Sequence, residues 1–164
     1  MIKSLFLATI LSIALISCER EGSGKCEETN ISTATRASHN AGKTCTKCHS
    51  LGEDGNGCFT IAGTVYKKDK STPLTDAIMV LFNRDANDWT KITGEVKRIP
   101  IDKSGNFYTT ESVVFVGKYP AILVKKGTKW DTIPMVGSLS STASCNSCHS
   151  PKNDTTEPIY DFNN

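Results

Sequence analysis

A series of short stretches that alternate apolar and polar residues runs through the middle of the chain, and it restricts the fold more than any other feature. Turns rich in Gly, Asn and Asp separate these stretches. No stretch has a convincing helical period, so helices are expected only as short pieces near the cysteines. Short strands spaced in this way predict an antiparallel β-sandwich. The expected strands cover residues 59–66, 76–82, 97–101, 107–110, 113–116, 119–124 and 129–133.

Three segments of this region share their residues with a known type of domain. They are residues 59–66 (FTIAGTVY), 73–82 (PLTDAIMVLF) and 102–109 (DKSGNFYT). Together they resemble small transthyretin-like or carboxypeptidase-regulatory-like domains, over about residues 59 to 125. The resemblance implies an Ig-like or transthyretin-like β-sandwich. Because these residues serve strands and turns, the resemblance concerns the fold and does not indicate a peptidase.

The N-terminus has the pattern of an export signal. A short positive start ending at Lys3 precedes an apolar run over residues 5–16, which has the length of a secretory signal and is too short to cross a bilayer. The run ends in Leu-Ile-Ser-Cys18, which resembles the lipobox of bacterial lipoproteins. The resemblance implies that Cys18 becomes the acylated mature N-terminus and anchors the protein to a lipid membrane. An ordinary signal peptide followed by a chance Cys is the alternative.

Length and charge limit the classes of function. Removal of residues 1–17 leaves about 147 residues, which is enough for one domain. The chain has 19 Lys and Arg against 17 Asp and Glu, and loss of Lys3 makes this 18 against 17. There is no basic run and no basic patch interleaved with aromatic residues, so nucleic-acid binding is not expected.

Residues 45–49 (CTKCH) and 145–149 (CNSCH) repeat the pattern Cys-x-x-Cys-His. This pattern is the attachment signature of c-type haem, in which the two thiols add to the vinyl groups and the His ligates the iron. With seven Cys and three His among 164 residues, chance predicts roughly 0.005 such motifs. We therefore expect two covalent haems. The residues that would hold them are Cys45, Cys48, His49, Cys145, Cys148 and His149.

Two other interpretations of the Cys pairs remain open. The four cysteines would suffice for a Cys₄ zinc site, but such a site does not need the His that follows each pair, and an exported protein seldom relies on reduced thiols. A redox-active dithiol is the other alternative, although neither pair lies in the βαβ context of thioredoxin-like proteins.

The remaining His and one Met are candidates for the sixth iron ligands. His39 lies six residues before Cys45, and the block 38–49 (SHNAGKTCTKCH) resembles bacterial multihaem cytochromes, in which an upstream His is a distal ligand. Met135 lies ten residues before Cys145, and a thioether ligand would raise the reduction potential. A surface-loop His and a core Met are the alternatives for these two residues. Met79 lies within an apolar stretch and is expected in the core.

Cys26 and Cys58 remain after the motifs and Cys18 are assigned, and an oxidising compartment favours a disulfide between them. Two unrelated thiols are the alternative, because sequence does not give connectivity.

The sequence as a whole predicts an electron-transfer cytochrome of the c type and not an enzyme. We expect it in the bacterial cell envelope (periplasm, outer membrane or cell surface), exchanging electrons with redox partner proteins. The alternatives are a haem-based peroxidase or ligand sensor, and a binding lipoprotein without haem that zinc or disulfides stabilise. The expected divisions are a signal peptide (1–17), a tether (18–37), a first haem-binding segment (38–58), the sandwich (59–135), and a second haem-binding segment with the tail (136–164).

Overall fold

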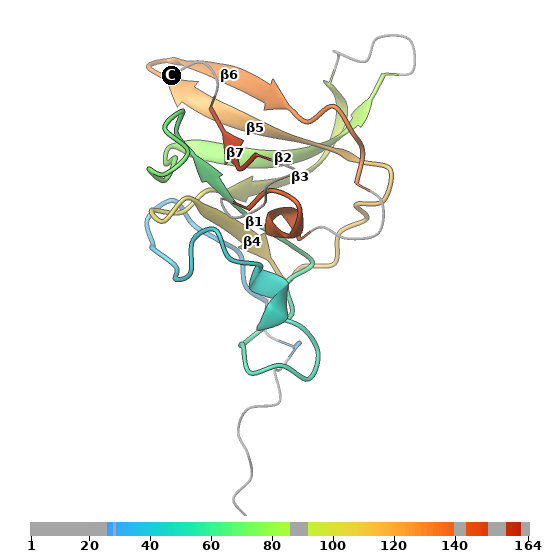
Figure 1. Cartoon of the computed structure of the whole chain (residues 1–164). Coiled ribbons are helices and arrows are strands. Elements are labelled where there is room, and N and C mark those ends of the chain that lie inside the picture. Colours follow the sequence, from blue (N-terminus) through green and yellow to red (C-terminus); the bar gives the residue numbers. More distant parts are fainter. Residues whose placement is uncertain (1–25, 28, 86–91, 140–143, 151–156, 162–164) are drawn as a thin grey trace, which may run out of the picture.

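The computed structural model describes residues 26–27, 29–85, 92–139, 144–150 and 157–161, and it is built from strands (Figure 1). Two sheets face each other, and they form the β-sandwich that the strand pattern predicts. The predicted signal peptide, Cys18 and the first part of the tether lie outside the described residues. Within the described residues, no helix has the length and apolar character needed to span a membrane.

The first sheet has three strands and the second has four. In the first sheet the order is β4-β1-β7, with β1 antiparallel to β4 and parallel to β7. In the second sheet the order is β3-β2-β5-β6, and all neighbours are antiparallel. The strands are β1 (Ile61–Tyr66), β2 (Ala77–Arg84), β3 (Ile92–Pro100), β4 (Asn106–Thr109), β5 (Tyr119–Lys126), β6 (Lys129–Pro134) and β7 (Ile159–Tyr160).

The core lies between the two sheets and is formed by the inward-facing residues of their central strands. Strand β2 contributes Met79 and Leu81, and strand β1 contributes Ile61 and Val65. These side chains are at most 1% exposed, so the apolar surface that they bury is the main stabilising contribution to the sandwich. The expectation that Met79 belongs to the core is confirmed.

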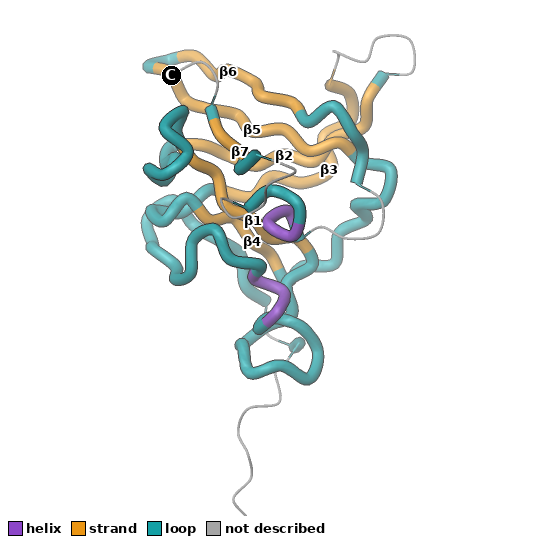
Figure 2. Tube along the Cα trace, viewed as in Figure 1, coloured by secondary structure: helices purple, strands orange, loops and turns teal. Residues whose placement is uncertain are grey.

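Strand β1 is buried along its whole length, because both of its faces are covered. Side chains alternate between the two faces of a strand, so Ile61, Gly63 and Val65 share the core face and Thr64 lies on the other. Two one-turn 3₁₀ helices lie next to β1 (Figure 2, purple). They are η1 (Cys45–Lys47) and η2 (Cys145–Ser147), which begin the two Cys-x-x-Cys-His motifs.

The structure corrects the expected strands in three places. Residues 113–116 form no strand but a loop, in which Val114 and Val116 are 72% and 61% exposed. Strand β3 begins at Ile92, earlier than expected, because its N-terminal half pairs with the end of β2 across a register shift. Strand β7 extends the sandwich beyond the predicted range 59–135.

A truncation in the central strand tests this description of the core. Leu81→Ala removes a fully buried side chain and should lower the free energy of unfolding by about 2–5 kcal/mol. Leu51→Ala removes a side chain that is 81% exposed and should change it by less than about 0.5 kcal/mol. Urea unfolding followed by circular dichroism measures both, and equal effects would contradict the assigned core.

Candidate functional site

The two Cys-x-x-Cys-His motifs have the same local structure. In each, a single 3₁₀ turn begins at the first Cys, whose carbonyl accepts hydrogen bonds from the backbone N–H of the second Cys and of the His. The N···O distances are 3.1 and 3.0 Å in the first motif, and 3.2 and 2.8 Å in the second. Residues three and four apart on such a turn lie on the same side. Both thiols and the imidazole of each motif therefore face one region.

Each motif faces a cavity of its own. Cys45, Cys48 and His49 line a cavity of about 330 Å³, which we call site one. Cys145, Cys148 and His149 line a cavity of about 350 Å³, which we call site two. Both volumes lie within the range of about 300–1,000 Å³ that is typical of small-molecule and cofactor sites.

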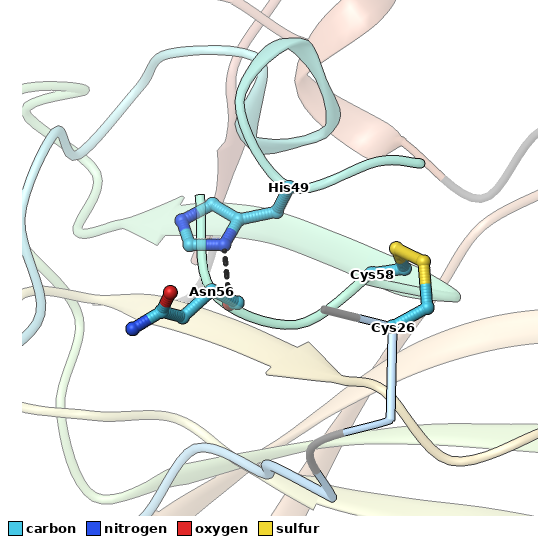
Figure 3. The surroundings of a disulfide bond; sticks show 4 residues. All are labelled: Cys26, His49, Asn56 and Cys58. Carbon is cyan, nitrogen blue, oxygen red and sulfur yellow. Dashed lines mark hydrogen bonds between the residues drawn. A yellow bond between two sulfur atoms is a disulfide. The ribbon is translucent and has the colours of Figure 1, made fainter. Parts of the chain in front are cut away.

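At site one, the imidazole of His49 is held by a backbone carbonyl. Its Nδ1 lies 2.9 Å from the carbonyl oxygen of Asn56. Figure 3 marks this contact with a dashed line. A carbonyl only accepts hydrogen bonds, so Nδ1 carries the proton and donates it. When a ring with its proton on Nδ1 binds a metal, the lone pair that it uses is on Nε2. This contact is the usual support of a metal-binding His.

A disulfide between Cys26 and Cys58 closes the loop that carries the Asn56 carbonyl (Figure 3), and it is the pairing that the cysteine count predicts. The bond joins residues 32 positions apart, so cross-linking stabilises the fold by roughly 3–4 kcal/mol in the chain-entropy model. Gly55 lies in the same loop, where an added Cβ would come within 2.8 Å of His49 Nδ1. The loop can therefore approach the imidazole only with glycine at this position.

His39 lies in the same site as His49. Both line the cavity, and their ring centroids are 6.0 Å apart. Two metal–nitrogen bonds of roughly 2 Å, together with the distance from each nitrogen to its ring centre, amount to about 6 Å. The measured centroid separation of 6.0 Å agrees with this length. Phe59 stacks on His49 with centroids 4.0 Å apart, and Tyr108 stacks on Phe59, which keeps the His49 ring in place.

At site two, His149 is held in the same way by different residues. Its Nδ1 donates to the carbonyl of Glu157 at 2.8 Å, which again leaves the lone pair on Nε2. The Glu157 carboxylate accepts hydrogen bonds from Lys70 Nζ at 2.6 Å and from the Tyr160 hydroxyl at 2.8 Å. These bonds lower the pKa of Glu157, the Lys70 bond most, and they keep the carboxylate ionised. Beyond it, Ile159 and Tyr160 pair with β1 as β7.

Met135 lines the apolar wall of site two, together with Phe107, Ile122 and Ile133. Its backbone is fixed on both sides: its N–H donates to the Pro120 carbonyl at 2.9 Å, and its carbonyl accepts from Arg84 Nη2 at 2.8 Å. The core residue Met79 lines the same cavity, so site two has a second thioether within it.

The edge of β1 receives the second motif. Ser144 forms a parallel bridge with Ala62, and the Thr64 N–H donates to Asn146 Oδ1 at 3.0 Å. Cys145 packs against Gly63, where an added Cβ would lie 2.8 Å from the Cys145 Cβ. Close packing of the 3₁₀ turn η2 on strand β1 therefore requires glycine at this position.

The two motifs also meet each other. Thr46 Oγ1 donates to Ser144 Oγ at 3.1 Å, although 98 positions separate these residues in sequence. The segments before and after the sandwich, each of which carries one motif, therefore lie on the same side of it. The two motifs are neighbours.

The first thiols of the two motifs, Cys45 and Cys145, do not have the lowered pKa of redox-active cysteines. Burial raises the pKa of Cys145 to about 12, and the nearby Cys45 adds to the rise. Burial is also the main cause that raises the pKa of Cys45. Reactive dithiols have lowered pKa values, because the thiolate is the nucleophile. Among the residues that the structure describes, no three His, Cys, Asp or Glu side chains form a group that could hold a metal ion.

Comparisons with protein-family models, with curated proteins and with solved structures find no match to this chain. The assignment of the two sites therefore depends on their geometry alone.

The sequence did not predict the groups that hold the two imidazoles, because the carbonyls of Asn56 and Glu157 are backbone atoms without a side-chain signature. A weak signal is the similar spacing, seven residues after His49 and eight after His149. Asn146 was missed because it occupies a variable position of the motif.

The raised pKa values predict slow alkylation of one thiol in the folded chain produced without haem attachment. At about pH 8, Cys145 should react with iodoacetamide far more slowly than the exposed Cys148. Its rate should increase as pH rises toward its pKa of about 12, because only the thiolate reacts. Mass spectrometry of peptides measures both rates. In concentrated urea the two rates should converge, and equal rates in the folded protein would contradict the raised pKa of Cys145.

Proposed function

We propose that this protein is an electron-transfer c-type cytochrome of the bacterial envelope that carries two covalent haems. One observation supports this most strongly. Each Cys-x-x-Cys-His turn presents two thiols and one imidazole to its own cavity, and in each the Nδ1–H donates to a backbone carbonyl, so that Nε2 is the ligating nitrogen. The same arrangement, built twice from different surroundings, matches what covalent haem attachment requires.

The residues of the two sites have defined roles in this proposal. Bound haem supplies the one-electron chemistry of its iron. Cys45 and Cys48 at site one, and Cys145 and Cys148 at site two, hold the macrocycle through thioether bonds. His49 and His149 would ligate the iron through Nε2, and the carbonyls that accept from Nδ1 would make each imidazole a stronger ligand.

His39 at site one and Met135 at site two are the proposed distal ligands. His39 is supported by its ring separation of 6.0 Å from His49, and Met135 by its place on the wall of site two. A site with two axial protein ligands favours electron transfer over the binding of peroxide or small gases, because such substrates need an open iron position. We therefore propose electron transfer in preference to a peroxidase or sensor function.

The alternatives without haem receive less support from the geometry. A single Cys₄ site needs all four thiols around one ion, whereas the two pairs face two cavities. The raised pKa values of Cys45 and Cys145 are unfavourable for dithiol exchange. The proposed protein is exported, anchored to a lipid membrane through acylated Cys18, and exchanges electrons with partner proteins of the envelope.

Mass spectrometry of the protein expressed with a haem-maturation system tests the proposal directly. The wild type should gain the mass of two haems, beyond any lipid, and give a haem-staining band. The paired variants Cys45→Ala/Cys48→Ala and Cys145→Ala/Cys148→Ala should each gain one haem, because each pair attaches one macrocycle. A colourless wild type without added haem mass would refute the proposal. Retention of both haems in either paired variant would contradict the assignment of that pair.

The distal ligands are tested by absorption and EPR spectroscopy of single variants. His39→Ala should convert the iron of site one from low spin to high spin, and Met135→Leu should do so at site two, because each removes one axial ligand. Met79→Leu is the matched control, since it changes the other thioether of site two in a volume-conserving way. If Met79→Leu, and not Met135→Leu, produces the high-spin signal, Met79 is the ligand and the assignment of Met135 is wrong.

A further inference from the structure

A continuous network of hydrogen bonds, buried at Asn146 and Thr64 and half-buried at Ser38, joins the second motif to the loop that carries His39. It begins at Asn146, the first residue between Cys145 and Cys148, whose Nδ2 donates to Thr64 Oγ1 at 2.9 Å. Thr64 Oγ1 donates to Asn106 Oδ1 at 2.6 Å. Asn106 Nδ2 donates to Ser38 Oγ at 2.9 Å and to the His39 carbonyl at 3.2 Å.

The chain ends on a carboxylate. The Ser38 hydroxyl donates to Asp102 Oδ2 at 2.5 Å, and the Ser38 N–H donates to the same oxygen at 3.0 Å. The other oxygen, Oδ1, accepts from the backbone N–H of Ser104 and Asn106. A charged acceptor at the end gives every hydroxyl and amide of the chain a defined donor direction, and hydrogen bonds linked in this way strengthen one another.

The same side chains also fix the backbone between His39 and the first motif. Asn146 Nδ2 donates to the Lys43 carbonyl at 2.8 Å, and Thr64 Oγ1 accepts from the Gly42 N–H at 2.9 Å. This short segment has positive φ angles at Asn40 (56°) and Gly42 (78°), so it forms a tight loop that needs external support. The support comes from β1, from β4 and from the second motif.

Because its central residues are buried, breaking this hydrogen-bond network costs free energy of folding. Asn146, Thr64, Asn106 and Asp102 are each at most 2% exposed, so water does not readily replace a lost partner. Removing one member leaves buried donors or acceptors unsatisfied, which costs more than the net value of the hydrogen bond itself. The loop that carries His39 therefore depends on a residue that belongs to the other motif.

From this arrangement we propose that Asn146, a residue of the second motif, is a positioning residue for His39 at site one, so that the two sites are coupled through the buried chain. The inference rests on the proposed function. It goes beyond it by assigning to one variable position of a Cys-x-x-Cys-His motif a role at the other haem. Ser147, the second variable position, gives the contrast, because its hydroxyl donates to the Ser144 carbonyl at 2.6 Å and stays within its own turn.

The test uses the full chain in the Cys145→Ala/Cys148→Ala background, where only site one would carry haem. Carbon monoxide is the probe, because it binds ferrous haem in competition with the distal ligand. Asn146→Ala should weaken His39 ligation and raise the carbon monoxide affinity of site one by about tenfold, the effect of losing one or two buried hydrogen bonds. Ser147→Ala, the matched control, should leave it within about twofold.

A double-mutant comparison separates positioning from general loosening of the fold. In a His39→Ala background, Asn146→Ala should produce no further change in carbon monoxide affinity, because the ligand on which it acts is already absent. If Asn146→Ala and Ser147→Ala behave alike, or if Asn146→Ala still raises the affinity without His39, the inference is overturned. Asn146→Asp, which keeps the size and the oxygen that accepts from Thr64 N–H, provides a second variant with the same expected direction should Asn146→Ala not fold.

The outcome for this inference is distinct from the outcome for the proposed function. Absence of haem mass in the wild type refutes the function, whereas two attached haems with no effect of Asn146 refute only the coupling. If His39→Ala leaves the affinity for carbon monoxide unchanged, His39 is not the distal ligand, and the coupling fails while the two-haem assignment stands.

Discussion

The side chain of Thr64 is the contact on which the arrangement of both motifs depends. Its hydroxyl, on the central strand of the smaller sheet, donates to Asn106 and accepts from Gly42 and Asn146. Three segments that are distant in sequence are therefore held by one buried oxygen. A hydroxyl has one proton and two lone pairs, and all three are used here. An apolar residue of similar size would fill the space but would leave the polar atoms of these segments without partners.

The two sites share a local turn but differ in their surroundings. Site one opens between polar loop residues, and His39, its proposed distal ligand, is exposed. Site two is lined by the apolar side chains of β5 and β6 and contains two thioethers. Axial Met ligation and a more apolar environment both change the reduction potential of a haem. The proposed cytochrome therefore has two unequal centres, and their motifs meet through the hydrogen bond between Thr46 and Ser144.

Much of the fold followed from local patterns, and the errors have identifiable causes. Apolar stretches bounded by turn residues predicted β1, β2, β4, β5 and β6 within a few residues. Residues 113–116 resembled a strand through their Val and Phe content, yet they pair with no sheet, and propensity alone does not create hydrogen-bonding partners. Strand β7 is two residues long and pairs in parallel with β1, and so short a strand leaves no local signal in the sequence.

The sequence by itself determined the chemistry of the candidate sites: two thiols and an imidazole at fixed spacing, repeated, with cysteines left over for a disulfide. Short-range spacing carries this information because one turn of backbone brings those side chains to one side. Only the tertiary structure decided that the two motifs are neighbours, that His39 lies 6.0 Å from His49, and that backbone carbonyls orient both imidazoles. These relations depend on which edges and faces of the strands remain uncovered once the sandwich has formed. Packing between residues that are distant in sequence determines them.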